Sequence, residues 1–217
     1  MMTTDNYIIF GVGAYVSVLD DILCDIYKQR NKCYKIEGFI DSDINKINKS
    51  YYGYGVLGSI KFIENISENT NGVIFITNGK RELIKNIHQV KFINFPNIIH
   101  PSATISKSAN IGHGNIIGQN VIISSNVVIG NFNHINYSVS IGHDCKIGDY
   151  NTIYGSSGIY GSAKIQNSVF VGAGSIVVGQ IVVNDNSKIS AGSIVQQDIP
   201  ENVLVMGNPG RIIKKIE

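Results

Sequence analysis

The sequence predicts an α/β domain followed by a parallel β-helix, on the evidence of two features. From Ile99 to Val195, every sixth residue is Ile or Val, without an insertion. Before this repeat, apolar strand-like and helix-like segments alternate, and glycines follow the first strand directly. A strict six-residue period fits neither the 3.6-residue turn of a helix nor an ordinary meander of strands. We therefore divide the chain into residues 1–97, 98–199 and a tail, 200–217.

Residues 1–97 have the pattern of a small Rossmann-like βαβ domain. We expect strands and helices to alternate in the order β, α, β, β, α, β over residues 7–10, 14–28, 36–40, 73–77, 81–88 and 90–95. Such alternation implies a parallel sheet covered by helices.

Ligands of open parallel sheets bind beyond the carboxyl ends of the strands. The Gly-Val-Gly turn after the first strand would suit a phosphate group there. However, the third glycine of the dinucleotide motif is absent, and Asp41 lies 30 residues after Gly11, where about 20 is typical of an NAD site. We interpret the edge as a nucleotide or nucleotide-sugar site, although glycines that only permit a tight turn would look the same. The candidate residues are Gly13, Ala14, Tyr15, Asp41, Ser42, Thr77, Asn78 and Gly79.

Residues 98–199 repeat a six-residue unit in which the first residue points inward, the second is often Gly and the fifth is small. Each unit then forms one side of a triangular prism. Three units close one coil, so residues 18 apart stack about 4.8 Å from each other.

The clearest candidate for catalysis is His143-Asp144, which we expect at an outward-facing corner of the prism. A neutral imidazole there can act as a general base, and a carboxylate beside its other nitrogen would hold the tautomer. His113 occupies the same position of its own repeat but is followed by Gly, so we interpret it as a surface residue. Cys145 takes a small inward position and is not expected to act as a nucleophile.

The 18-residue stacking places Gly161 above His143, where a bare backbone N–H could receive an oxyanion. The column formed by Gly155, Ala173 and Ala191 would leave a shallow groove for a long, thin ligand such as pantetheine. Small residues at the corners of a prism also have a purely steric explanation, so the argument depends on the combination.

The repeat with INYSVSIGHDCKIGDY and the closing VLVMGNPGRIIKK resembles the hexapeptide-repeat acyltransferases. With the βαβ domain ahead of it, the whole chain resembles the sugar acetyltransferases of the sialic acid O-acetyltransferase (NeuD) type, which include bacillosamine-pathway and perosamine N-acetyltransferases. The resemblance implies a left-handed β-helix, a homotrimer, and acetyl-CoA lying between neighbouring prisms. It also implies that the N-terminal domain holds the nucleotide of a nucleotide-linked amino sugar.

The resemblance assigns roles to individual residues. It implies a catalytic pair in His143 and Asp144, an active-site amide in Asn136, and an amide facing the thioester in Gly161. It implies backbone contacts to CoA at Ala173 and Ala191, near Gly155. Thr152, a further candidate contact for acetyl-CoA, stands where some members have another histidine near the CoA thioester. Gly13-Ala14-Tyr15 stands where some members have Ser-Gly-His in the first nucleotide loop. Arg211, Lys214 and Lys215 are candidate partners for CoA phosphates, or a solvated charge run.

From these observations we expect acetyl transfer to the amine, at C4, of a nucleotide-linked amino-dideoxy sugar used in surface polysaccharide or glycan biosynthesis. Transfer to a sugar hydroxyl is the nearest alternative, since the same base serves both acceptors. A zinc enzyme would need three converging histidines, and His113, His134 and His143 have unfavourable spacing for that. A non-enzymatic scaffold would show a ladder of outward threonines, which are scarce here, and would leave the N-terminal domain without a role.

Composition limits the classes of partner. A net charge of +2 argues against a nucleic-acid surface. No segment approaches the ~18 apolar residues of a membrane span, and no signal-peptide pattern opens the chain. Three cysteines without disulfide or metal spacing suit reduced thiols in the cytoplasm, so we expect a cytoplasmic enzyme without a metal.

Overall fold

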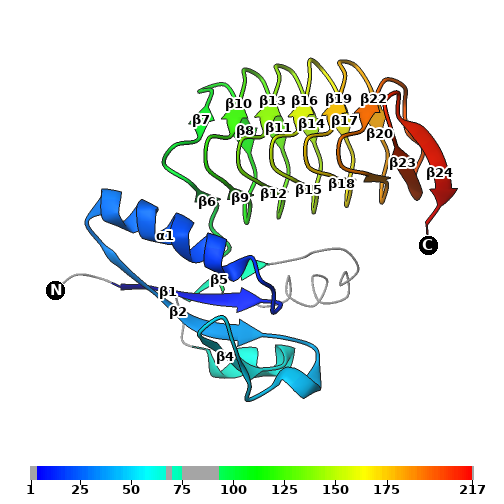
Figure 1. The fold of residues 1–217 in the computed structure, drawn as a ribbon. Helices are drawn as coiled ribbons and strands as arrows, with labels where there is room; N and C mark the ends of the chain where they lie inside the picture. The colour runs from blue at the N-terminus through cyan, green and yellow to red at the C-terminus, as the bar shows by residue number, and fades with distance from the viewer. Residues whose placement is uncertain (1–3, 67–69, 75–92, 217) are drawn as a thin grey trace. The chain divides into compact units, whose positions relative to one another are not determined.

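The computed structural model describes residues 4–66, 70–74 and 93–216. The chain divides into two compact units, Met1–Pro96 and Asn97–Glu217 (Figure 1). The first is an α/β unit and the second is a left-handed parallel β-helix. The predicted fold class is therefore confirmed.

The first unit is built around a sheet with strand order β3-β4-β2-β1-β5. Neighbouring strands run parallel except for β3 and β4, which form an antiparallel pair. Its described elements, in chain order, are β1 (Thr4–Phe10), α1 (Val16–Arg30), β2 (Cys33–Ile40), η1 (Ile44–Lys46), β3 (Ser50–Tyr51), β4 (Tyr54–Gly58), η2 (Ile60–Asn65) and β5 (Asn71–Ile74).

Strands β1, β2 and β5 and helix α1 were predicted from the sequence, with ends that differ by a few residues. Strands β3 and β4 were not predicted, because residues 50–58 are rich in Tyr and Gly and alternate only weakly. The helix expected at 81–88, and parts of the strands expected at 73–77 and 90–95, lie outside the described residues.

Helix α1 packs on the sheet through one apolar side, where Leu19, Ile22 and Leu23 are fully buried. It ends at Asn31, whose left-handed backbone (φ 51°) is tolerated by asparagine and lets its N–H donate to the Lys28 carbonyl. Asp20 on the helix accepts hydrogen bonds from the hydroxyls of Tyr34 and Tyr54. These bonds link the helix to β2 and β4.

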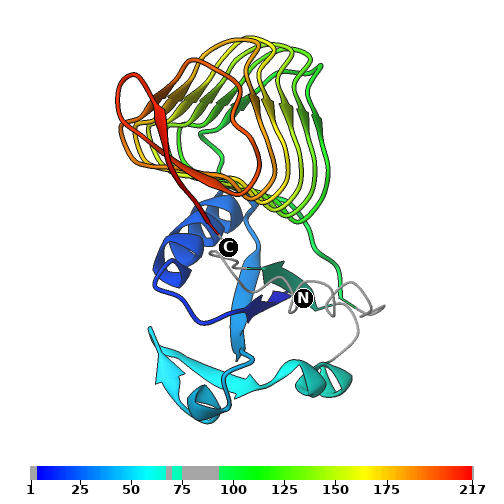
Figure 2. The same ribbon diagram turned by 90° about the vertical axis from the view of Figure 1, so that its right-hand side faces the viewer.

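The second unit stacks short strands into three parallel sheets that form the sides of a prism (Figures 1 and 2). Figure 2 shows successive coils following one another with little offset. From Ile98 to Val195, partners on neighbouring strands are 18 residues apart, as in Ile123 with Ile141 and Ile141 with Ile159. The stacking predicted from the six-residue period is therefore confirmed.

The strands of the prism are two residues long, each ending on the inward residue of its repeat. They are β6 (Ile98–Ile99), β7 (Thr104–Ile105), β8 (Asn110–Ile111), β9 (Ile116–Ile117), β10 (Ile122–Ile123), β11 (Val128–Ile129), β12 (His134–Ile135), β13 (Ser140–Ile141), β14 (Lys146–Ile147), β15 (Thr152–Ile153), β16 (Gly158–Ile159), β17 (Lys164–Ile165), β18 (Phe170–Val171), β19 (Ile176–Val177), β20 (Val182–Val183), β21 (Lys188–Ile189) and β22 (Ile194–Val195).

The inward Ile and Val side chains form one continuous core along the axis. Most are fully buried, and each contributes about 1.5–3 kcal/mol relative to an exposed side chain. A ladder of buried amides lies among them: the side-chain oxygen of Asn115 accepts the N–H of Asn133, and that of Asn133 accepts the N–H of Asn151. This ladder satisfies backbone donors that the turns leave open.

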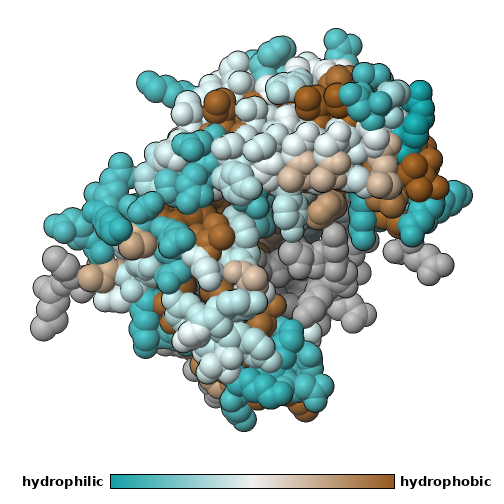
Figure 3. Space-filling model, in the orientation of Figure 1, coloured by the Kyte–Doolittle hydropathy of each residue, from teal (hydrophilic) through white to brown (hydrophobic). Residues whose placement is uncertain are grey.

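The tail at 200–217 forms β23 (Val203–Met206) and β24 (Arg211–Lys215). Strand β23 adds to the last coil by pairing with β21, and β24 returns antiparallel to β23. Ile212 and Ile213 are exposed on β24. Hydrophobic surface is visible at this end of the prism, at the right of Figure 3.

One half-buried histidine, His134, is expected to make the stability of the protein depend on pH. Burial lowers the pKa of His134 to about 4, and its Nε2 atom is inaccessible to solvent although part of the residue is not. Between pH 6.5 and 4 the unfolded chain binds a proton there that the folded chain does not. The free energy of unfolding should therefore fall as the pH falls, by about 2 kcal/mol between pH 7 and pH 5.

The check is chemical denaturation at pH 7 and pH 5. A His134→Thr variant, which copies the residue that pairs with it on β15, should lose less stability on acidification than the wild type. His113→Thr, at an exposed site, is the control and should keep the full loss. Equal losses in all three proteins would contradict the prediction.

Candidate active site

His143 and Asp144 lie at one corner of the prism, between β13 and β14. Nδ1 of His143 is 2.7 Å from Oδ2 of Asp144, and both side chains are about half exposed or more. Asp144 has a left-handed backbone (φ 60°), a conformation that aspartate adopts more readily than most residues. With the Nδ1 proton donated to this carboxylate, Nε2 keeps its lone pair for another partner.

A third residue, Asn126, completes this cluster and was not predicted. It lies one coil before Asp144, and its Nδ2 donates to Oδ1 of Asp144 at 3.1 Å. The hydrogen bonds from His143 and Asn126 hold the pKa of the Asp144 carboxyl below its usual value. The 18-residue spacing between Asn126 and Asp144 was the signal that could have identified it.

Gly161 lies one coil beyond His143. A Cβ built on Gly161 would be 3.6 Å from Nε2 of His143, so the free side of the imidazole faces this glycine. The neighbouring Ser162 N–H donates to the His143 carbonyl at 2.9 Å, and this bond fixes the stacking of the two turns. Among the hydrogen bonds of the described residues, none uses the Gly161 N–H as donor.

The column of small residues stacks as expected, but its first member is covered. The Gly174 N–H donates to the Gly155 carbonyl, and the Gly192 N–H to the Ala173 carbonyl. Ala173 and Ala191 are exposed, whereas Gly155 is buried.

The cover on Gly155 is the ring of Tyr137, which is 18 residues earlier in the chain. A Cβ on Gly155 would approach this ring to 2.7 Å, so the glycine makes room for an aromatic side chain. The groove expected over Gly155, Ala173 and Ala191 is therefore open only at the two alanines.

Asn136 and Thr152 are both buried. The Asn136 side-chain oxygen accepts the N–H of Tyr137 at 2.8 Å, which folds the amide onto its own turn. Thr152 pairs with His134 on one side and Phe170 on the other. Neither side chain is exposed at the corner that carries His143. Farther along the prism, Arg211 and Lys214 are exposed on β24.

Cys145 adjoins the site in sequence but faces the core. It is fully buried, its Sγ lies 3.7 Å from the Ile159 carbonyl, and burial raises the pKa of its thiol. This geometry gives it no access to a ligand at the corner. Among residues 4–66, 70–74 and 93–216, no group of three metal-ligating side chains converges.

In the first unit, the loop between β1 and α1 lies at the carboxyl edge of the sheet. Gly13 faces open space, since a Cβ there would have no neighbour within 4 Å, and Ala14 is exposed. Tyr15 is partly exposed and precedes the first residue of α1. Ser42 is exposed at the end of β2. These residues present an accessible edge, whereas Thr77, Asn78 and Gly79 lie outside the described residues.

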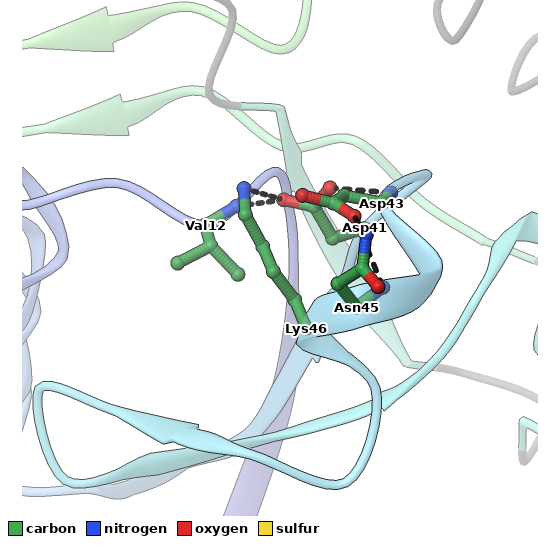
Figure 4. A network of polar contacts seen from close by, with 5 residues as sticks. All are labelled: Val12, Asp41, Asp43, Asn45 and Lys46. Atoms are coloured by element: carbon green, nitrogen blue, oxygen red, sulfur yellow. Dashed lines mark hydrogen bonds and ion pairs between the residues drawn. The ribbon is translucent and has the colours of Figure 1, made fainter.

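Asp41 differs from its neighbours at this edge because its side chain is wholly buried. Its Oδ2 accepts the N–H of Val12 at 2.9 Å and Nζ of Lys46 at 3.0 Å, and its Oδ1 accepts the N–H of Asp43 at 2.9 Å (Figure 4). Both oxygens of the Asp41 carboxylate thus accept hydrogen bonds from the protein itself, in the loop after β1 and the segment after β2. We expected Asp41 to contact a ligand; in the structure it holds the β1–α1 loop against the end of β2.

Comparisons with known proteins support the fold. No family model matches the sequence, and no curated protein matches it. The solved structure of PerB from Caulobacter crescentus, in complex with CoA and GDP-perosamine, has a TM-score of 0.81 at 22% identity, over 96% of this chain and 97% of that one. The chain has the fold of that protein. The resemblance seen in the sequence is confirmed at this level.

Two further structures agree. WeeI from Acinetobacter baumannii AYE has a TM-score of 0.81 at 23% identity, over 97% of this chain and all of that one. The acetyltransferase domain of PglB from Neisseria gonorrhoeae, in complex with acetyl coenzyme A, has a TM-score of 0.70 at 20% identity, with the same coverage.

None of the helices in the described residues is long and apolar enough to cross a membrane.

Proposed function

We propose that this protein transfers the acetyl group of acetyl-CoA to the amine of a nucleotide-linked amino-dideoxy sugar. The observation that carries the proposal is the hydrogen bond between His143 Nδ1 and Asp144, which leaves Nε2 as a proton acceptor facing Gly161. The match in fold to a protein solved with CoA and GDP-perosamine supports the choice of both substrates.

In the proposed reaction, the amine at C4 of the sugar attacks the thioester carbonyl carbon, and Nε2 of His143 takes the proton that the nitrogen loses. Asp144 holds the imidazole in the required tautomer and stabilises its charged form. The Gly161 N–H donates to the oxygen of the tetrahedral intermediate. Collapse breaks the C–S bond, and His143 returns the proton to the departing thiolate. The products are the N-acetyl sugar and free CoA, without an acyl-enzyme.

The exposed strip at Ala173 and Ala191 is the proposed place for the pantetheine arm, with Arg211 and Lys214 as partners for the CoA phosphates. Ala173 and Ala191 stack in a different column of the prism from His143 and Gly161, so we propose a homotrimer in which the strip of one prism faces the His143 corner of a neighbouring prism. The exposed edge at Gly13, Ala14, Tyr15 and Ser42 would hold the nucleotide. The reaction would take place in the cytoplasm.

The test is release of free thiol from acetyl-CoA in the presence of UDP-, dTDP- and GDP-linked 4-amino sugars, each beside its 4-hydroxy counterpart. Turnover confined to amino sugars, and lost in His143→Ala, is the expected result and identifies the nucleotide. Turnover only with hydroxyl acceptors would replace the proposal with sugar O-acetylation, which the same base would serve. Absence of turnover with every acceptor would overturn it.

Tyr15 provides a separate test of the nucleotide site. Its position at the loop before α1 makes it a contact for the base or sugar, so Tyr15→Ala should raise KM for the nucleotide sugar at least fivefold, roughly one lost contact of 1 kcal/mol. KM for acetyl-CoA should change less than twofold. The two constants are measured by steady-state kinetics with each substrate varied in turn, and the reverse pattern would contradict the two-site assignment.

A further inference from the structure

We propose that Asn126 is a positioning residue for catalysis, which acts through Asp144 to orient His143. This inference rests on the proposed function, since it assumes that His143 is the base. It adds Asn126, which lies one coil earlier, to the pair formed by the adjacent residues His143 and Asp144.

The geometry gives the carboxylate of Asp144 two separate tasks. Its Oδ2 accepts Nδ1 of His143 at 2.7 Å, and its Oδ1 accepts Nδ2 of Asn126 at 3.1 Å. A carboxylate held by a donor on each oxygen has little freedom to rotate. Asn126 therefore fixes the plane of the Asp144 carboxylate, and this carboxylate in turn orients the imidazole of His143.

The position of Asn126 is itself fixed from the coil below. Its own N–H donates to Oγ of Ser108 at 3.0 Å, and its left-handed backbone (φ 58°) is one that asparagine adopts readily. On the next coil, the Asp144 N–H donates to the Ser125 carbonyl at 3.0 Å. The two turns are thereby held in register before any substrate binds.

The chain contains a matched turn that lacks only the carboxylate. Asn120 has φ 55° and donates its N–H to Oγ of Ser102 at 2.9 Å. The residue 18 positions later is Ser138, whose N–H donates to the carbonyl of Gln119, as that of Asp144 does to Ser125. A substitution at Asn120 therefore reproduces the structural cost of one at Asn126 without touching the catalytic pair.

The first arm of the experiment removes the side chain with glycine, which tolerates the left-handed backbone. Asn126→Gly should lower kcat about 3- to 10-fold, the amount expected for one hydrogen bond of ordinary net strength, with both KM values unchanged. Asn120→Gly should stay within twofold of wild type. Equal effects of the two substitutions on kcat would overturn the proposal.

The second arm measures a property that a purely structural role would not change. Asn126→Asp keeps the backbone preference and places a second negative charge beside Asp144, which favours the protonated imidazole. The acidic limb of the kcat/KM profile should then move to higher pH by about 0.5 unit, while Asn120→Asp should leave it in place. An unmoved limb in Asn126→Asp would overturn the proposal.

A third readout does not depend on activity. The ring resonances of His143, assigned by their loss in His143→Ala, are followed by NMR against pH in the unliganded protein. Their titration midpoint should rise in Asn126→Asp and not in Asn120→Asp. If the wild type transfers no acetyl group but this midpoint moves, the proposed function fails and the link from Asn126 to His143 stands. If the wild type is active and the midpoint does not move, the link fails alone.

Discussion

Replacement of His143 with alanine is expected to lower kcat by a factor of about 10² to 10⁴, the usual contribution of a general base. The variant keeps the prism, because the His143 side chain is 65% exposed and its removal leaves no cavity. Both KM values should change little, since the imidazole acts on a proton and not on the binding of either substrate. Steady-state kinetics with acetyl-CoA and the best acceptor sugar check this.

His113 provides the matched control for this variant. It occupies the same position of its hexapeptide, is exposed, and packs edge-to-face on Phe132 with ring centroids 5.0 Å apart. His113→Ala should therefore retain full activity. A loss of less than tenfold in His143→Ala would remove this residue from the role of base. A loss of the same size in both variants would indicate a structural effect.

The prism could be predicted because the same pattern of buried side chains recurs in every coil. Each coil buries the same kind of side chain at the same interval, so Ile123, Ile141 and Ile159 share one column in both the sequence pattern and the structure. If the inward residue of one repeat were assigned wrongly, the period of the neighbouring repeats would show the correct position. The spacing of 18 residues also placed Gly161 next to His143 without any knowledge of side-chain conformations.

What could not be predicted depends on where individual side chains turn. The small column was expected to be open, but the ring of Tyr137 covers Gly155. The six-residue period predicts which residues stack in one column. It does not predict the rotamer of Tyr137, which precedes Gly155 in that column. Asn126 was missed for the opposite reason: its column was available from the sequence, but corner asparagines recur in the repeat because they adopt left-handed turns. The hydrogen bond from its side chain to Asp144 distinguishes Asn126 from Asn120.

The first unit was predicted less completely because it lacks a repeat. The β1–α1–β2 segment has strong apolar patterns, whereas β3 and β4 are specified by their pairing and not by their composition. Asp41 shows the same limit. An acidic residue at the end of a strand predicts a ligand contact, but the sequence does not reveal that the backbone donors of Val12 and Asp43 meet its carboxylate first.

The role found for Asp41 leads to the second large effect. Asp41→Ala is expected to destabilise the first unit by about 3 kcal/mol, because it removes a wholly buried carboxylate and leaves the half-buried N–H groups of Val12 and Asp43 without their acceptor. Lys46 is 25% exposed and can turn toward solvent, so its charge adds little to this cost. The β1–α1 loop should open, which native-state hydrogen exchange detects as faster exchange of the Val12 amide.

Asp43→Ala is the control for this variant, since it removes a nearby carboxylate that serves only a local turn. Asp43 accepts the N–H of Asn45 at the start of η1, and the loss of such a cap costs about 1 kcal/mol. Exchange at Val12 should stay near that of the wild type in Asp43→Ala and rise about 100-fold in Asp41→Ala, the ratio that roughly 3 kcal/mol of local opening free energy implies. If Asp41→Ala leaves this exchange unchanged, the loop is held by other contacts. Because the same loop carries the proposed nucleotide contacts, KM for the nucleotide sugar should rise together with the exchange rate, while KM for acetyl-CoA stays constant.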